Sequence, residues 1–448
     1  MMKWVAIVSL ACGCVGPSAF PCQASDQCVG PGGQGFCEPL GYCSFPDPTC
    51  GSGRRFGEHV TTDRALRCTD LFSGDGGGRD GAPACKPLVG MEEIAAGREH
   101  ACARAGGNVW CWGRNNLGQV GDGTSGNIRT RPTQVAGLEG ATQLALGLGH
   151  SCARTADGKV SCFGDNGQGQ LGNGTVGGSV SWVGEVTSLS GIDVIRAGER
   201  HVLALRSDGA VLSWGANAYG QGGFDPEGNA GTPSLVAISS VVEISAGNRH
   251  SCAMTRGGTS PAEAWCWGNN HVGELGIGSI EDKNYFGPMH VVSLPNISFI
   301  ASGHETSCAI TAGTEVYCWG RNDKGQLGFG PSGNNQPTPA KVLVLKDAFG
   351  ISLGDKHTCA WKVDGSLWCW GDNEQSQFGQ KTTSAMEPVP ARLDLPFGTK
   401  QLAIGGAFSC ALTLEGAVYC FGDNSYGQLG NGASGTQRAL APMATCAP

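Results

Sequence analysis

Paired cysteines are the residues in this sequence whose type and spacing most directly allow chemistry. Six pairs flank short turn sequences: Cys102 with Cys111, Cys152 with Cys162, Cys252 with Cys266, Cys308 with Cys318, Cys359 with Cys369, and Cys410 with Cys420. If each turn joins two antiparallel strands, a directly opposed pair has Cα atoms ~4.5 Å apart, which is within reach of a disulfide. We therefore expect six disulfides, each linking the two strands of one hairpin.

A seventh copy of this pattern supports the pairing, because it lacks both cysteines at once. It has Leu203 and Ser213 in their places, and joint loss is what a covalent pair predicts. The turns agree with a constant register. Residues 156–158 (Ala-Asp-Gly) suit a type I turn followed by a left-handed glycine, and the shorter 106–107 (Gly-Gly) suits a two-residue hairpin loop.

Signatures of catalysis are absent from the sequence. It contains no HExxH zinc motif, no GxSxG nucleophile motif and no phosphate-binding loop with its lysine. The acidic residues are scattered over predicted turns. We therefore expect neither an enzyme nor a cofactor, and one alternative stays open: carboxylates that converge only in the folded chain.

The cysteine pairs are positioned by a repeat that occurs seven times. The copies start near residues 94, 144, 195, 244, 300, 351 and 402. β-Branched and aromatic residues alternate at period two on both sides of each turn, as in HSCAR and KVSCFG, which is typical of half-buried strands. Because one such unit is too small to bury a core alone, the copies must stack on their neighbours.

Two further positions are the same in all seven copies. An asparagine lies in the closing GxNxxGQLG-like turn, and a glycine precedes each first-cysteine position. Asparagine caps turns with its side chain, and glycines at one register indicate close backbone approach. We expect structural roles for Asn115, Asn166, Asn217, Asn270, Asn322, Asn373 and Asn424, and for Gly97, Gly147, Gly198, Gly247, Gly303, Gly354 and Gly405.

The N-terminal part has a different character. Lys3 and the apolar stretch 4–11 resemble an export signal, to which we assign residues 1–14, and Cys12 or Cys14 stands where a bacterial lipoprotein would be acylated. Residues 15–72 hold closely spaced cysteines among Gly, Pro and Ser, which predicts a small disulfide module of open connectivity. Residues 73–85 form a glycine-rich linker, and 86–448 hold the repeats.

Composition indicates an exported chain without affinity for nucleic acid. The 22 cysteines fit an oxidising compartment. The formal net charge of −8 provides no basic field for nucleic acid. We expect an extracytoplasmic monomer, either secreted or held in the bacterial cell envelope by an N-terminal lipid, with no other contact to a membrane.

The repeat resembles that of the regulator of chromosome condensation family. That family combines a glycine-led HSxAL-like strand, a DGxVYxWG-like strand and a GQLG-like turn, and the match covers residues 94 to about 435. The resemblance implies an all-β fold, a seven-bladed β-propeller, preceded here by the small cysteine-rich disulfide module. The cysteine pairs and the signal are similar to those of bacterial secreted members. The turns of copies three and six (GQGG and SQFG) depart from the pattern.

A histidine recurs at one register in five copies: His100, His150, His201, His250 and His357; Thr306 and Phe408 stand there in copies five and seven. In a seven-fold ring these histidines would lie too far apart to share one metal ion, so we expect each imidazole to hydrogen-bond a neighbouring turn. The nucleotide-exchange activity of the family's eponymous member is not expected, because an exported chain would not meet a cytosolic GTPase.

Binding is therefore the expected function. Propellers present variable loops from a rigid disc, and aromatic residues in those loops are candidate partner contacts: Trp182, Tyr219, Phe224, Tyr285, Phe286 and Tyr426. The expected ligand is a protein or a glycan, bound through loops on one face. The alternative is an extracellular hydrolase or lyase that uses carboxylates in the central channel.

The first and last copies must be joined, since open strand edges would otherwise remain. Cys85 lies just before the first copy, Cys446 lies after the last, and neither has a partner within a repeat. We expect a Cys85–Cys446 disulfide that clasps the ends of the ring, with Cys68 as the rival partner.

Overall fold

The computed structural model describes residues 88–225, 228–256, 261–330, 332–379, 384–393, 395 and 398–435, together with the backbone of short strands outside these ranges. The chain divides into two units, residues 1–86 with 446–448 and residues 87–445. The described residues form strands and turns and no helix, hence none that is long and apolar enough to cross a membrane.

Short strands make up the described part of the first unit. β1 (Val29–Gly30) pairs with β2 (Gly33–Gln34), and β3 (Phe36–Cys37), β4 (Cys43–Pro46) and β5 (Arg54–Phe56) form an antiparallel sheet. β6 (Cys85–Pro87) and β35 (Ala444–Cys446) form a two-stranded sheet. The expected signal, Cys12, Cys14, Cys68 and all N-terminal disulfide pairings lie outside the described residues, as do the side chains of Cys85 and Cys446.

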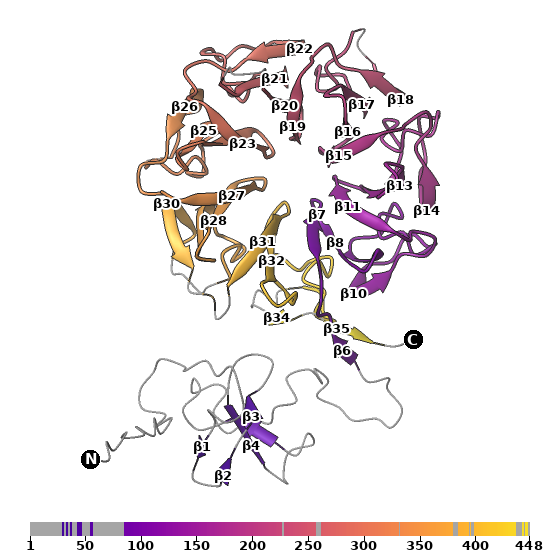
Figure 1. Ribbon diagram of the computed structural model, residues 1–448, viewed down its shortest axis with the longest axis vertical. Coiled ribbons are helices and arrows are strands. Elements are labelled where there is room, and N and C mark those ends of the chain that lie inside the picture. The colour runs from indigo at the N-terminus through magenta and orange to yellow at the C-terminus, as the bar shows by residue number, and fades with distance from the viewer. Residues whose placement is uncertain are drawn as a thin grey trace, which may run out of the picture. The chain divides into compact units, whose positions relative to one another are not determined.

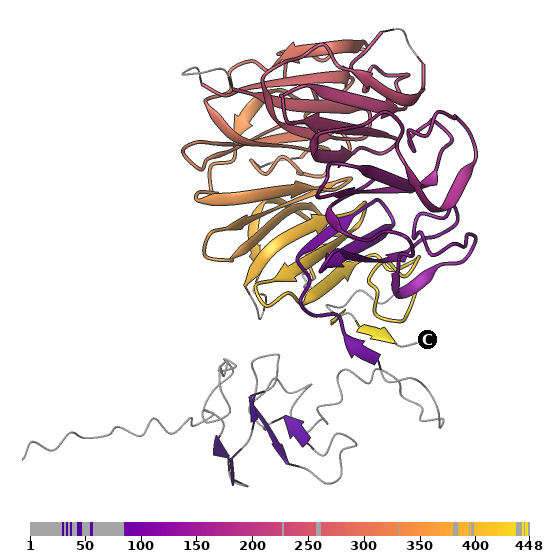
Figure 2. The same ribbon diagram turned by 45° about the vertical axis from the view of Figure 1, so that its right-hand side comes forward.

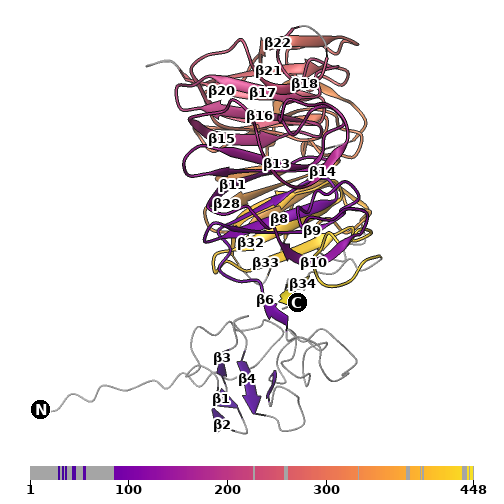
Figure 3. The ribbon, with the colours of Figure 1, turned by 90° about the vertical axis from the view of Figure 1, so that its right-hand side faces the viewer.

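The second unit is a ring of seven four-stranded antiparallel sheets, which confirms the expected all-β, seven-bladed propeller (Figure 1). Figures 2 and 3 show the same ring obliquely and from the side. Each repeat supplies one blade, whose strands run in chain order from the centre to the rim. The innermost strands are β7 (Glu93–Ala96), β11 (Ala141–Leu146), β15 (Ile192–Ala197), β19 (Val241–Ala246), β23 (Ile297–Ser302), β27 (Ala348–Leu353) and β31 (Thr399–Ile404).

The other strands of each blade follow outward. The second strands are β8 (His100–Ala105), β12 (His150–Thr155), β16 (His201–Arg206), β20 (His250–Thr255), β24 (Thr306–Thr311), β28 (His357–Lys362) and β32 (Phe408–Thr413). The third strands are β9 (Asn108–Gly113), β13 (Val160–Asp165), β17 (Val211–Gly215), β21 (Glu263–Asn269), β25 (Val316–Gly320), β29 (Leu367–Asp372) and β33 (Val418–Gly422). The outermost strands are β10 (Arg129–Gln134), β14 (Ser179–Glu185), β18 (Ala230–Leu235), β22 (Asn284–His290), β26 (Gln336–Lys341), β30 (Met386–Leu393) and β34 (Ala441–Pro442).

The second and third strands of every blade form a hairpin with one constant register, in which the paired cysteines face each other directly. In blade 3, Leu203 faces Ser213 in the same register. All six expected disulfides are present, each with its Cα atoms 4.1 Å apart: Cys102 with Cys111, Cys152 with Cys162, Cys252 with Cys266, Cys308 with Cys318, Cys359 with Cys369, and Cys410 with Cys420. The described disulfides therefore lie inside the blades, one per hairpin, and blade 3 folds without one.

The hydrophobic core is divided among the interfaces between neighbouring blades. Five blades bury a tryptophan of the third strand completely (Trp112, Trp214, Trp267, Trp319 and Trp370), and the other two bury Phe163 and Phe421 there. Each indole N–H donates to a carbonyl in the closing turn of the preceding blade, as Trp214 does to Gln170 at 3.0 Å. Blades are thus held together by paired polar contacts as well as by apolar area.

Blade 7 joins blade 1 through contacts of the same kind. β7 lies beside β31 (Figure 1), and the side chain of Gln401 accepts from the N–H of Ile94 and donates to its carbonyl, both at 3.1 Å. Trp112 donates to Gln428 across the same junction (2.9 Å). These bonds close the ring, although each blade takes all four of its strands from its own repeat. The Cys85–Cys446 clasp stays a prediction.

Candidate functional site at the channel mouth

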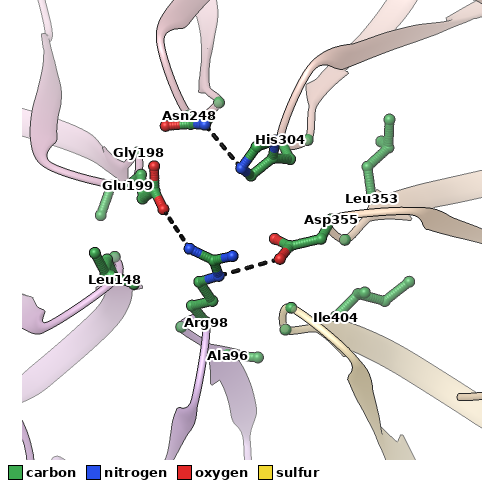
Figure 4. Close-up of a pocket in the computed structure, with 18 of the residues that line it drawn as sticks. Ala96, Arg98, Leu148, Gly198, Glu199, Asn248, His304, Leu353, Asp355 and Ile404 are labelled. Atoms are coloured by element: carbon green, nitrogen blue, oxygen red, sulfur yellow. Dashed lines mark hydrogen bonds and ion pairs between the residues drawn. The ribbon is translucent and has the colours of Figure 1, made fainter. Parts of the chain in front are cut away.

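Seven residues, one from each blade, surround one end of the central channel. Each directly follows the invariant glycine of its repeat, and we call them the mouth ring: Arg98, Leu148, Glu199, Asn248, His304, Asp355 and Gly406. Together with their neighbours they line a cavity of about 200 Å³ (Figure 4). The mouth ring therefore joins side chains that lie far apart in the sequence.

Backbone hydrogen bonds hold the mouth ring around its whole circumference. Each member donates its N–H to a carbonyl of the next blade, from Arg98 to Gly147 (3.2 Å) around to Gly406, which donates to Arg98 (3.0 Å) and closes the circle. The invariant glycines permit this approach, because a Cβ at Gly147 would lie 2.5 Å from the carbonyl oxygen of Gly198. The backbone under the mouth is consequently rigid, whatever side chains it carries.

One cation links three blades across the mouth. The Arg98 guanidinium donates to Glu199 (Nη1 to Oε1, 2.8 Å) and to Asp355 (Nε to Oδ2, 3.1 Å), as Figure 4 shows. Burial lowers the pKa of Arg98, but Asp355, Glu199 and Glu99 outweigh burial and raise it. Arg98 is therefore a firmly charged clasp between blades 1, 3 and 6.

His304 supplies a second polar group at the mouth. Its Nε2 lies 2.8 Å from Nδ2 of Asn248, and its Nδ1 lies 3.7 Å from Oε2 of Glu305. Burial lowers the pKa of His304, but Glu305, Asp355 and Glu199 raise it overall. The contact with His304 and the ion pair with Arg321 outweigh burial and lower the pKa of Glu305 to about 2. Because the amide nitrogen of Asn248 is a donor, Nε2 of His304 accepts from it, and the ring proton lies on Nδ1, on the side of Glu305.

Two of the predicted partner-binding aromatics lie on the same face as the mouth ring. Tyr219 and Tyr426 are half-buried in the closing turns of blades 3 and 7. Arg249 lies over the Tyr219 ring (4.2 Å to its centre), and Arg114 lies over Tyr426 (4.7 Å). Each cation–π contact joins a turn to the next blade around the ring.

The other predicted aromatics lie toward the rim. Trp182 is 66% exposed on β14. Tyr285 and Phe286 are half-buried on β22, whose backbone packs against Gly220 in the turn of blade 3, and half-buried Phe224 packs beside that same turn. Four of the six aromatics therefore gather where blades 3 and 4 meet, whereas Trp182 and Tyr426 lie on other blades.

The recurring histidines are buried between blades. Four of these histidines have a serine opposite them on the next blade. In each, Nε2 lies 2.8 to 3.0 Å from the serine hydroxyl: His100, His201, His250 and His357. The serine in turn donates to the closing turn of the histidine's own blade, as Ser251 does to Gln221 (2.8 Å), so the imidazole Nε2–H must be the donor. Burial lowers the pKa of these histidines to about 3 or 4. The expected bond to a turn thus runs through a serine.

His150 is the exception, because blade 3 has Val202 at the position where blades 2, 4, 5 and 7 have serine. Among the described residues, neither buried ring nitrogen of His150 has a hydrogen-bond partner, and neither does the buried hydroxyl of Ser213 in blade 3. Burial, with a contribution from the charge of Arg200, lowers the pKa of His150 to about 3. The interface between blades 2 and 3 therefore lacks a cross-link that its neighbours have.

A second cavity, of about 410 Å³, lies beside the lengthened hairpin of blade 4. Ile238, Trp265 and Pro288 line it together with Glu263. The Trp265 indole donates to the hydroxyl of Thr255 (3.2 Å), which holds the ring in place. This cavity is on the hairpin side of the blade and shares no residue with the mouth.

The mouth ring was not among the residues selected from the sequence. Its position varies freely between repeats, as Arg, Leu, Glu, Asn, His, Asp and Gly, and so it lacks a motif. The available signal was this variation itself, at the position directly after an invariant glycine. The described part of the chain brings no cluster of His, Cys, Asp or Glu together that could hold a metal ion.

Together, the fold and the mouth define a seven-bladed repeat propeller with a rigid polar opening on one face. The chain belongs to the family of the regulator of chromosome condensation (RCC1) repeat, since two forms of this repeat match it over most of the ring. One form matches residues 106–154, 208–254, 262–310, 315–361 and 415–445, and the other matches 92–119, 141–170, 192–221, 241–274, 297–326, 350–380 and 400–428.

Known proteins are similar over most of this chain. The ultraviolet-B receptor UVR8 of Arabidopsis thaliana is 30% identical over 367 residues, which are 79% of this chain and 80% of UVR8. The E3 ubiquitin-protein ligase HERC2 of Homo sapiens is 29% identical over 81% of this chain, which spans only 8% of HERC2. The crystal structure of Prp20p of Saccharomyces cerevisiae has a TM-score of 0.64 at 21% identity, covering 81% of this chain and 87% of Prp20p, and shows the shared fold.

Proposed function

We propose that the protein is an exported, non-catalytic propeller scaffold that binds a protein partner through the face carrying the mouth ring. The observation that carries this proposal is a division of roles within the repeat. Buried Trp, His and Ser side chains hold neighbouring blades together and the Cys pairs link strands within a blade. The mouth ring, in contrast, changes from blade to blade on a backbone fixed by a closed circle of hydrogen bonds. Variable side chains on a rigid frame are suited to recognition.

Export is supported by the disulfides. Six buried cysteine pairs in one ring are typical of proteins that fold under oxidising conditions, as in an envelope or outside the cell. A lipid on Cys12 or Cys14 and a bacterial envelope location belong to the same proposal. The similar proteins reported above come from a plant, from Homo sapiens and from yeast, and their similarity concerns the repeat and not the compartment.

A protein partner is favoured over a glycan at this face. The mouth cavity is small, at about 200 Å³, and charged side chains border it, so an extended surface would contact the face around it. Propellers of this fold do bind proteins: yeast RCC1 has been solved with Kap60 bound, and Prp20p is described with binding properties to Gsp1p and histones. Those partners are not assigned to this chain.

The enzymatic alternative has one observation in its favour, because Glu199 and Asp355 line one cavity. A hydrolase or lyase of this type needs one carboxyl group that donates a proton and one that accepts it. Here the same Arg98 guanidinium bonds both carboxylates, so neither is free to exchange a proton with a substrate. The arrangement supports a clasp between blades over acid–base catalysis.

Site-specific photo-cross-linking tests the proposal. A benzophenone amino acid is placed at exposed Ala218, in the closing turn of blade 3, or at Val363, an 81% exposed residue on the hairpin side of blade 6. We expect a protein from the native envelope or medium to be captured from position 218 and not from 363. Equal capture from both positions, or none from 218, would contradict binding at this face. Chemical conversion of a captured molecule that is lost in Glu199→Gln would support the enzymatic alternative instead.

A further inference from the structure

Each blade brings two variable residues together beside the mouth ring. One residue lies directly before the second strand, and the other lies at the end of the third strand. The residue at the end of the third strand donates its backbone N–H to the carbonyl of the residue before the second strand. In blade 1 these residues are Glu99 and Arg114, which form an ion pair. In blade 5 they are Glu305 and Arg321, again an ion pair (2.5 Å). Blade 6 also pairs opposite charges (Lys356 with Asp372), whereas blades 2 and 7 pair an aspartate with a neutral residue (Asp165 with Gly149, Asp423 with Ala407).

Blades 3 and 4 differ from the other five, because a positive charge at their paired positions has no negative partner there. Their paired positions hold Arg200 with Ala216 and Arg249 with Asn269, so each arginine faces a neutral residue. Both arginines are exposed, and within the described residues neither forms an ion pair. Two neighbouring blades consequently present uncompensated positive charge on the mouth face.

The surroundings of the two arginines are fixed and partly aromatic. The circle of backbone bonds links their blades directly, since Glu199 donates to the carbonyl of Gly247 (3.1 Å). Tyr219 lies under the guanidinium of Arg249, 4.2 Å from its ring centre. The mouth carboxylate next to Arg200 is Glu199, which is already bonded to Arg98 (2.8 Å). The guanidinium groups therefore have N–H donors available to a ligand.

We propose that Arg200, Arg249 and Tyr219 form a docking site for an acidic segment of the partner protein. This inference rests on the proposed function and specifies the chemistry of the partner. A guanidinium binds a carboxylate through two parallel hydrogen bonds, and the tyrosine adds apolar contact. The chain has a net charge of −8, so these uncompensated arginines are opposite in sign to the chain as a whole and attract an acidic segment. Nucleic acid would need a longer row of cations than these two.

Fluorescence anisotropy with the full chain tests this site. The probe is a fluorescein-labelled peptide of six glutamates with one central phenylalanine, and the control peptide has glutamines in place of the glutamates. We expect the Arg200→Ala, Arg249→Ala double variant to lose at least tenfold in affinity for the acidic peptide. Tyr219→Leu, which keeps apolar contact, is expected to lose less. Arg256→Ala removes an exposed arginine from the hairpin side of blade 4 and serves as the matched control, with unchanged affinity.

Three results would overturn the inference: equal binding of the acidic peptide by the double variant, equal binding of the glutamine peptide, or tighter binding of a twelve-nucleotide oligo-dT than of the acidic peptide. Thermal melting of the double variant is measured in parallel and should match the wild type, since both side chains are exposed. If position 218 still captures a partner while the double variant binds normally, only this inference fails. If position 218 captures nothing, the proposed function fails with it.

Discussion

Glu274→Gln is expected to stabilise the protein at neutral pH and to have no effect in acid. Glu274 is 1% exposed in the closing turn of blade 4, where the other six blades have glutamine. Its carboxylate accepts the N–H of Val272 (2.9 Å), as the glutamine side-chain oxygen does in the other turns. Glutamine also has an amide group that can donate, as Gln326 does to Asp323 at 3.0 Å. A carboxylate in that place brings a buried charge and no such donor.

The size of the effect follows from the pKa of Glu274. Burial, aided by Glu305, raises this pKa from an ordinary 4.5 to about 7. Between these values the folded chain holds a proton that the unfolded chain has released, so the free energy of unfolding falls as pH rises through this window. At about 1.4 kcal/mol per pH unit, the loss amounts to at most about 3 kcal/mol. Glutamine does not titrate, so the advantage of the variant should grow from near zero at pH 4.5 to about 3 kcal/mol above pH 7.

Urea unfolding, followed by tryptophan fluorescence at several pH values between 4 and 8, measures this difference. Glu243 titrates in the same window, because burial raises its pKa to about 7. It is present in both proteins, so its effect on the free energy of unfolding cancels in the difference between them. Glu263→Gln removes an exposed carboxylate from the same blade and is the matched control, with no gain at any pH. An equal gain at pH 4.5 and pH 8, or no gain at pH 8, would refute the buried-charge explanation.

Three other predictions concern the blade interfaces and the ring ends. Val202→Ser should give His150 the hydroxyl that other blades provide and raise the free energy of unfolding by about 1 kcal/mol, whereas Val202→Ala should lower it; thermal melting distinguishes the two. Cys446→Ser should free one thiol at Cys85 and lower the melting temperature, and mass spectrometry after alkylation would contradict the clasp if it found the free thiol elsewhere. Tyr285→Ala should destabilise the protein by roughly 2 kcal/mol, because its ring packs on the core of blade 4; unchanged melting would show instead that the ring is a free contact.

The fold could be predicted because its determinants are local and repeat. Period-two alternation, the facing cysteines and the closing turns all act within one copy, and seven copies average out local exceptions. The paired loss at Leu203 and Ser213 even indicated which residues face each other, since only direct neighbours explain a joint change. Ring closure was harder to foresee: Gln401 and Ile94 are joined by ordinary side-chain and backbone bonds, for which no residue type is diagnostic.

The site could not be predicted in the same way. Arg98, Glu199 and Asp355 belong to three copies that are not adjacent, and only the closed ring brings their side chains across the channel. The exposure of the aromatic candidates could not be predicted either, because it depends on contacts between blades. Whether Tyr285 is exposed depends on how the turn of the neighbouring blade covers β22, and that is a property of the interface and not of either repeat.

The exceptions in the histidine register show that the interface between blades is the unit on which substitutions act. Where blade 7 has Phe408 in place of histidine, blade 1 has Ala101 in place of serine, so both polar partners are gone together. Between blades 2 and 3 one partner has changed alone, leaving His150 buried opposite Val202. That interface borders Arg200, which belongs to the proposed docking site. The docking site itself spans blades 3 and 4, whose interface keeps the His201–Ser251 bond (2.8 Å), so the arginines extend from a cross-linked part of the rigid frame.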